Sequence, residues 1–184
     1  MASVRVFLLR HGHSTFQESY EVTNVDPGII DAPLSDRGRA QVAAAARDVA
    51  RLAPDLVVTS PLTRAIETTL GVVRDAEVRI RVDPLVRERL GDACDVGRAP
   101  TALAEAYPAL DFAHLPEVWW HRGPPDERGL PIEPRELLQQ RVDRFRAWLA
   151  GREEERILVV SHSGFLRYLS GEQLDNCVVR EWSP

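Results

Sequence analysis

The stretch that decides the fold is VRVFLLRHGHS, residues 4–14. Its first half is an apolar run rich in β-forming residues, which predicts a buried central strand over 4–9. Arg10, His11 and His13 follow this run without an intervening turn. Because a buried strand rarely ends in charged and titratable side chains without a chemical reason, we interpret its end as one part of a functional site.

Strands and helices are predicted to alternate along the rest of the chain. Further short strands are expected over 56–59, 78–82, 157–160 and 177–182, and helices after Ser35, after Ser60, near 101–106, over 136–150 and before the last strand. Such alternation implies crossover connections. The predicted fold class is therefore α/β, a three-layer sandwich with a mainly parallel central sheet.

Local signals predict where these elements begin and end. Ser35 is a suitable N-cap for an alanine-rich helix that ends before Pro54, and Ser60 is predicted to cap a helix with Pro61 at its first position. The segment 16–34 is rich in polar and turn residues and predicts irregular structure with a turn at 26–28. We expect a single domain, 1–184, with an inserted excursion at about 97–133.

Composition excludes several classes of function. The net charge of −5 argues against nucleic acid as a partner. No apolar run is long enough for a membrane span and no signal segment is recognisable, so we expect no membrane association and a cytoplasmic location. All 23 basic residues are arginine, which excludes a lysine-dependent phosphate loop and Schiff-base chemistry. Cys94 and Cys177 are too few for a disulfide framework.

Chemistry-bearing side chains follow four of the predicted strands. In open α/β sheets the ligand lies beyond the carboxyl ends of the strands. Two histidines, two arginines and a glutamate are predicted to meet there: Arg10, His11, Arg64, Glu88 and His162. Arginine donors match phosphate oxygens, a histidine can attack phosphorus, and a carboxylic acid can protonate the departing oxygen. The pattern predicts a site for a phosphoryl group.

Three segments in this order, LLRHGHS, SPLTRAIET and VVSHSGFLR, resemble the histidine phosphatase superfamily, also called phosphoglycerate-mutase-like. The segments LVRERLGDACDVG, AYPALDF and NCVVRE are similar to the plant- and fungal-type members, which are mostly phosphatases. The resemblance implies a metal-independent phosphomonoester hydrolase that needs no cofactor and acts on a small phosphorylated substrate through a phosphohistidine.

The resemblance also implies roles for individual residues. His11 would be the nucleophile, and Glu88 the proton donor and later the base. The phosphate oxygens would be held by Arg10, Arg64 and His162, with Gln17 and Ser163 as further phosphate- or substrate-binding residues. Two positions depart from the common pattern: His13 stands where glutamate is usual, and Ser163 separates the second histidine from Gly164.

Other interpretations remain open at this stage. A mutase would pass the phosphoryl group to a second hydroxyl instead of water, and a non-catalytic module would bind a phospho-ligand in the same pocket. His11 and His13, with Asp92 or Asp95, have the residue types of a metal site. Glu67 is an alternative to Glu88 as the acid.

Overall fold

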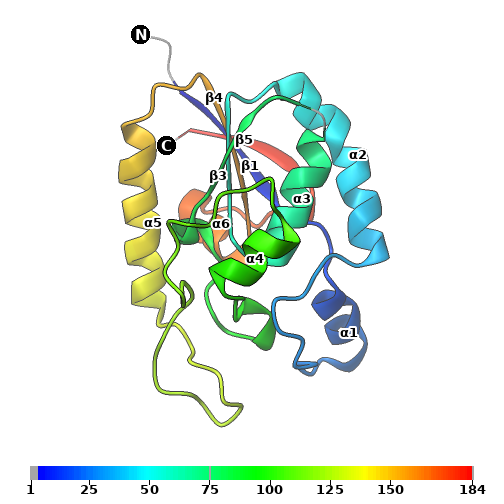
Figure 1. Cartoon of the computed structure of the whole chain (residues 1–184), viewed down its shortest axis with the longest axis vertical. Helices are drawn as coiled ribbons and strands as arrows, with labels where there is room; N and C mark the ends of the chain where they lie inside the picture. Colours follow the sequence, from blue (N-terminus) through cyan, green and yellow to red (C-terminus); the bar gives the residue numbers. More distant parts are fainter. Residues whose placement is uncertain (1–3, 75, 184) are drawn as a thin grey trace.

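The computed structural model describes residues 4–74 and 76–183 of the chain, which contain a five-stranded sheet (Figure 1). The strands are β1 (Arg5–Arg10), β2 (Leu56–Thr59), β3 (Arg79–Val82), β4 (Arg156–Ser161) and β5 (Val179–Trp182). Their order is β3-β2-β4-β1-β5; the first four are parallel and β5 is antiparallel to β1. The predicted α/β class with a mainly parallel sheet is confirmed.

Helices cover both faces of this sheet. They are α1 (Thr15–Thr23), α2 (Asp36–Leu52), α3 (Thr63–Val73), α4 (Pro100–Ala106), α5 (Arg135–Ala150) and α6 (Ser163–Ser170), with short 3-10 turns η1 (Pro84–Val86) and η2 (Ala93–Asp95). In Figure 1, α5 lies on one side of the sheet and α2 with α3 on the other. Among the described residues, no helix has the length and apolar character that a membrane span requires.

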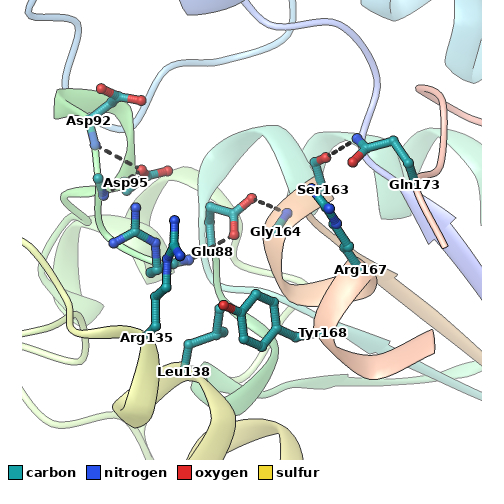
Figure 2. Close-up of a pocket in the computed structure, with 12 residues that line it drawn as sticks. Glu88, Asp92, Asp95, Arg135, Leu138, Ser163, Gly164, Arg167, Tyr168 and Gln173 are labelled. Atoms are coloured by element: carbon teal, nitrogen blue, oxygen red, sulfur yellow. Dashed lines mark hydrogen bonds between the residues drawn. The ribbon is translucent and has the colours of Figure 1, made fainter. Parts of the chain in front are cut away.

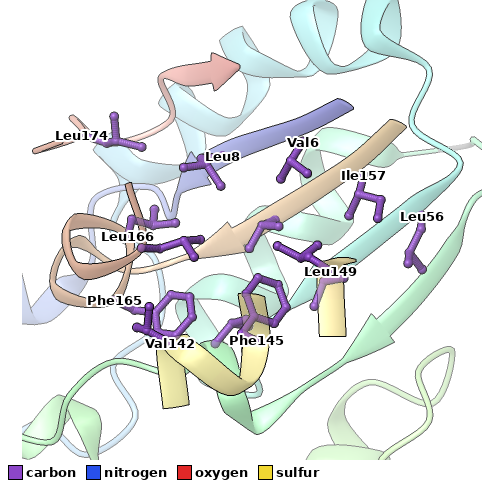
Figure 3. Close-up of a cluster of buried hydrophobic side chains, with 14 of the residues drawn as sticks. Val6, Leu8, Leu56, Val142, Phe145, Leu149, Ile157, Phe165, Leu166 and Leu174 are labelled. Carbon is purple, nitrogen blue, oxygen red and sulfur yellow. The ribbon is translucent and has the colours of Figure 1, made fainter. Parts of the chain in front are cut away.

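Two apolar cores separate the sheet from its helices. Alternate side chains of β1 point to opposite faces, as the period of a strand requires. Val6 and Leu8 pack with Phe145 of α5 and Phe165 of α6, as Figure 3 shows for this cluster. The other face of β1 packs against α2 and α3. The central strands are therefore buried on both faces, and this packing fixes the positions of the polar residues that follow their carboxyl ends.

The prediction that 16–34 is irregular was wrong for its first part, because α1 spans Thr15–Thr23. Ser14 and Gln17 form a reciprocal capping box at its start, and Asn24 ends it in the left-handed conformation. Phe16 is its one buried residue. The helix therefore has no apolar stripe that a periodicity argument could detect. The turn predicted at 26–28 lies instead at 30–31; at 26–28 the Asp26 side chain accepts from the N–H of Gly28, which has φ +70°.

The start of α3 also differs from the prediction. Ser60 does not cap this helix; its hydroxyl accepts from the backbone N–H of Leu62, and Leu62 itself is the N-cap residue. The segment 60–62 forms a turn before the helix begins at Thr63. By contrast, the hydroxyl of Ser35 accepts from the Gly38 N–H and caps α2 as predicted.

The segment 97–133 has few regular elements but is well packed. It contains α4, and Leu103, Phe112 and Trp119 form a core with side chains of α3 and β3. The indole N–H of Trp119 donates to the carbonyl of Arg98. The segment is thus fixed against α3 and the edge strand β3.

Candidate active site

His11 and His162 meet because they follow neighbouring parallel strands in the same register. Arg10, the last residue of β1, pairs with Ser161, the last residue of β4. Neighbouring strands lie about 4.8 Å apart, so the next residue of each strand stands beside the other. The two imidazole centroids are 5.0 Å apart, and the backbone N–H of His11 donates to the carbonyl of Ser161. The predicted meeting of the two histidines is confirmed.

The ring of His11 has a defined orientation. Its Nδ1 lies 2.7 Å from the carbonyl oxygen of Gly12, and Nε of Arg64 donates to its Nε2 over 3.3 Å. These partners assign the proton to Nδ1 and the lone pair to Nε2. Burial, followed by the charges of Arg64 and Arg10, holds the pKa of His11 well below its usual value. His11 is therefore a neutral imidazole whose nucleophilic nitrogen faces a cation.

Gly12 permits a close backbone approach at this point. A Cβ on Gly12 would lie 2.9 Å from the carbonyl oxygen of Gly38, which is closer than real side chains come. Its N–H donates to Oγ1 of Thr68 on α3. The turn that presents His11 is thus fixed by helices on one face of the sheet.

His162 presents nitrogen atoms that the protein does not satisfy. Its side chain is fully buried, and within the described residues neither ring nitrogen has a hydrogen-bond partner. The same holds for Nε of Arg10. Buried polar atoms without partners are rare in native proteins. Such nitrogens on both Arg10 and His162 therefore make these residues candidates for binding a ligand.

The guanidinium groups of Arg10 and Arg64 are held by hydrogen bonds to backbone carbonyls and, for Arg64, to a carboxylate. Nη1 of Arg10 donates to the carbonyl of Leu174. Arg64 is 3% exposed; its Nη1 donates to the carbonyl of Cys94 and its Nη2 to Asp95, at 2.6 and 2.8 Å. Arg64 follows β2, as the sequence predicted. The sequence did not predict that the turn η2, with Cys94 and Asp95, would hold its side chain.

Glu88 lies at the N-terminus of α6. Its carboxylate accepts from the backbone N–H groups of Gly164 and Phe165, at 2.8 and 3.1 Å, and from the N–H of Arg89. Burial, followed by the charge of Asp95, raises the pKa of Glu88 despite these donors. A raised pKa favours the protonated acid that can donate to a leaving oxygen.

A buried ion-pair network supports the segment that carries Glu88. Glu133 is 1% exposed and accepts from Arg87, from Arg141 and from the N–H of Leu90. Arg141 on α5 also donates to the carbonyls of Leu85 and Arg87, on the approach to Glu88. The segment 85–90 is therefore clamped from both sides, which limits the movement of the acid.

A cavity of about 450 Å³ opens at Glu88 (Figure 2). Figure 2 shows Glu88 between Asp95 and Gly164, with Arg135, Leu138 and Tyr168 along the opposite wall. Its lining residues are Glu88, Arg89, Gly91, Asp92, Asp95, Arg135, Leu138, Ser163, Gly164, Arg167, Tyr168 and Gln173. Of the five central residues only Glu88 lines this cavity; Arg10, His11, Arg64 and His162 do not. Glu88 is linked to the histidines through the N–H of Gly164, two residues after His162. A leaving group in this cavity is therefore within reach of the acid.

The contacts of Gln17 and Ser163 differ from those of the five central residues. Gln17 caps α1, and its Nε2 lies 3.4 Å from Oδ1 of Asn176. Asn176 donates in turn to the backbone carbonyl of His11, a contact that no motif suggested. Ser163 lines the cavity, where its hydroxyl accepts from Gln173. For both residues a contact with substrate stays a prediction.

The alternative metal interpretation of His11 and His13 finds no cluster to support it. His13 is buried between the hydroxyl of Ser35 and the carboxylate of Glu21. Within residues 4–74 and 76–183, no three histidine, cysteine or acidic side chains gather as metal ligands would. His13 thus fastens α1 to α2 in this structure.

Glu67, the alternative acid, is used elsewhere. Its carboxylate accepts from the backbone N–H of Leu34 and from the hydroxyl of Tyr107. It does not line the cavity that contains Glu88. The geometry therefore favours Glu88 over Glu67.

The match to a family extends over almost the whole chain. The family model for the histidine phosphatase superfamily, branch 1, matches residues 6–182. A glucosyl-3-phosphoglycerate phosphatase of Mycolicibacterium vanbaalenii is 30% identical over 177 residues, which cover 92% of this chain and 74% of that protein.

Two further similarities concern a plant protein and a solved structure. Phosphoglycerate mutase-like protein 1 of Arabidopsis thaliana is 26% identical over 94% of this chain and 72% of its own length. The plant proteins are thus among the relatives, but the bacterial phosphatase has the higher identity. The crystal structure of an alpha-ribazole phosphatase from Shigella flexneri has a TM-score of 0.67 at 22% identity, over 97% of this chain and 89% of that one, and shares the fold.

Proposed function

We propose that this chain, which belongs to branch 1 of the histidine phosphatase superfamily, hydrolyses small phosphomonoesters through a phosphohistidine on His11. The single observation that carries the proposal is the arrangement around His11. A neutral imidazole with its lone pair on Nε2 lies beside a second buried imidazole and a buried guanidinium. Such a group of donors stabilises a transferring phosphoryl group.

In the first step, Nε2 of His11 attacks phosphorus and the bond from phosphorus to the ester oxygen breaks. Arg64 releases its contact with Nε2 and donates to a phosphoryl oxygen, and Arg10 and His162 donate to the others. Protonated Glu88 gives its proton to the departing alkoxide. The products are the free alcohol and a phosphohistidine.

In the second step, water attacks the phosphohistidine. The Glu88 carboxylate left by the first step accepts a proton from this water, the bond from nitrogen to phosphorus breaks, and inorganic phosphate leaves. His11 regains its lone pair on Nε2 and Glu88 regains its proton. No metal ion takes part in either step.

The cavity beside Glu88 suits a small polar leaving group. Its volume of about 450 Å³ falls within the usual range for small-molecule sites. Arg135 and Arg167 line it from α5 and α6, and among the described residues neither pairs with a carboxylate. Two cationic donors and the Tyr168 side chain favour an alcohol that carries hydroxyl or acidic groups.

The test measures phosphate release from p-nitrophenyl phosphate and from a panel of sugar phosphates and phosphorylated acids, with and without EDTA. We expect activity that EDTA does not remove, and a loss of at least about 1000-fold in His11→Ala. The matched control is His114→Ala, because Nε2 of His114 donates to the carbonyl of Val82 on the edge strand β3 and His114 does not line the cavity at Glu88. Mass spectrometry after an alkaline quench should find the phosphoryl group on His11 in the wild type.

Three results would contradict the proposal. Activity that His11→Ala retains would reject the nucleophile. Activity that EDTA abolishes and a divalent metal restores would reject the metal-independent route. Transfer of the phosphoryl group to a second hydroxyl without release of phosphate would make the protein a mutase.

A further inference from the structure

The guanidinium of Arg64 is held by a carboxylate that itself cannot move freely. Oδ1 of Asp95 accepts from Nη2 of Arg64 over 2.8 Å. Its Oδ2 accepts from the backbone N–H groups of Gly91 and Asp92, each at 3.1 Å. The Asp95 residue is 5% exposed. Both oxygens of a buried carboxylate are thus fixed, one by the chain and one by Arg64.

The remaining contacts of Arg64 determine which of its N–H groups are free for a ligand. Nη1 donates to the carbonyl of Cys94, so the outer nitrogens of the guanidinium are both tied to one turn. Nε donates to Nε2 of His11. When Nε2 of His11 bonds to phosphorus, Nε of Arg64 loses its acceptor. The oxygens bonded to that phosphorus are the acceptors that take its place. The turn that contains Asp95 therefore directs the Nε edge of Arg64 at the reacting group.

Asp95 also stands beside Glu88 in the same cavity wall (Figure 2). Two carboxylates close together disfavour ionisation of both. The negative charge of Asp95 therefore favours the protonated form of Glu88. Asp95 is the second cause, after burial, of the raised pKa of Glu88.

We propose that Asp95 is a positioning residue of the phosphoryl-transfer step, which fixes Arg64 through a buried ion pair and places a negative charge beside Glu88. This inference rests on the function proposed above and assigns a new residue to it. Asp95 does not touch the reacting atoms; it acts through Arg64 and Glu88.

Other charged and polar groups around Glu88 also affect its pKa, some of them in the direction opposite to Asp95. Arg64 and the N–H groups of Gly164 and Arg89 favour the ionised carboxylate. Further charged groups on the elements packed here are Arg10 on β1, Arg87, Arg89 and Asp92 between η1 and η2, Glu133, Arg135 and Arg141 at and before α5, and Arg167 on α6. Among these charges, that of Asp95 is the one that raises the pKa of Glu88 most, after burial itself.

The experiment compares Asp95→Asn with Asp95→Glu. Asparagine removes the charge and one of two acceptors, whereas glutamate keeps the charge and displaces it. For Asp95→Asn we expect kcat/KM for an alkyl phosphate to fall about 10- to 100-fold, since a hydrogen bond to a charged group is lost. The loss for p-nitrophenyl phosphate should be smaller, because its leaving group needs little protonation. The alkaline limb of the pH profile should move to lower pH.

The outcome for Asp95→Glu separates charge from placement. We expect kcat to fall while the alkaline limb stays at the wild-type pH. The matched control is Asp83→Asn, because Asp83 is equally buried and also accepts from an arginine and a backbone N–H, but lies outside the cavity. Its pH profile should keep the wild-type limbs.

The failure of this inference is distinguishable from failure of the proposed function. Equal losses for both substrates with an unmoved alkaline limb in Asp95→Asn would overturn the proposed effect of the Asp95 charge on Glu88. Wild-type kcat in Asp95→Glu would overturn the positioning role even if Asp95→Asn did not fold. In either case the wild type and His11→Ala would still decide whether the chain is a histidine phosphatase.

Discussion

Replacing Gly164 by alanine tests the role of Glu88 without removing its carboxyl group. The backbone N–H of Gly164 donates to Oε2 of Glu88 over 2.8 Å. A Cβ at this position would overlap Oε1 and would lie 3.1 Å from the carboxyl carbon. Because real Cβ atoms do not approach so closely, the carboxyl group must move away from the start of α6.

The size of the effect follows from this displacement. A misplacement of about 1 Å in a catalytic group reduces the rate about 100-fold, and general acid catalysis contributes about 100- to 10,000-fold in total. We therefore expect kcat for an alkyl phosphate to fall about 100-fold in Gly164→Ala. For p-nitrophenyl phosphate the loss should be less than about 10-fold, since a good leaving group depends little on the acid.

The fold should tolerate the change better than the activity does. Gly164 lies in the first turn of α6, where alanine is favoured over glycine by up to about 1 kcal/mol. We expect the free energy of unfolding to stay within about 1 kcal/mol of the wild type. The control is Gly151→Ala, where the nearest atom to a new Cβ is the Trp148 carbonyl oxygen at 3.7 Å. That variant should keep wild-type activity.

The assay is steady-state hydrolysis of both substrates, with urea unfolding of the same preparations. If folded Gly164→Ala hydrolysed the alkyl phosphate within about twofold of the wild-type rate, Glu88 would not be the proton donor. Equal losses for both substrates would point to a damaged phosphate site instead.

Three further predictions concern stability. Glu133→Ala leaves Arg87 and Arg141 buried without their carboxylate and should destabilise the fold by about 3–5 kcal/mol in urea unfolding; a change below about 1 kcal/mol would contradict the clamp. Gly38→Ala places a Cβ against the backbone of His13 and should lower the free energy of unfolding by about 1–3 kcal/mol, whereas a neutral result would reject the tight crossing. The lowered pKa values of His11 and His162 mean that the unfolded chain binds more protons, so stability should fall as the pH drops below about 6.5, by up to about 1.4 kcal/mol per pH unit for each histidine. His162→Asn should reduce this slope, and an unchanged slope would show that the imidazole is not kept neutral.

The sequence predicted the parts of the site that depend on strand ends. A strand has an apolar pattern with clear limits, and parallel strands bring their last residues to one edge. His11, His162 and Arg64 follow such strands, so the sequence alone predicts that they lie close together. Glu88 is also correctly placed, although a 3-10 turn separates it from β3.

The residues that hold these side chains could not be predicted in the same way. Asp95 lies in η2 and Asn176 in the loop before β5, in segments without periodicity. Their contacts depend on how the loops fold back over the sheet edge. The helix α1 was missed for a related reason, since its stability comes from the capping box at Ser14 rather than from an apolar face.

Residues at the strand ends and residues in the loops and helices have different proposed roles in the site. The residues proposed to bind the phosphoryl group follow β1, β2 and β4, which are held in a packed core, so this part of the site has little freedom to change. The cavity for the leaving group is lined from α5, α6 and the segment 89–95, and Arg135 and Arg167 carry side chains that nothing in the described chain engages as ion-pair partners. On the proposed function, we expect substitutions there to alter the recognised alcohol while the nucleophile and its cations keep their positions. Substrate preference and phosphoryl transfer should then be separable, and joined only at Glu88 and Asp95.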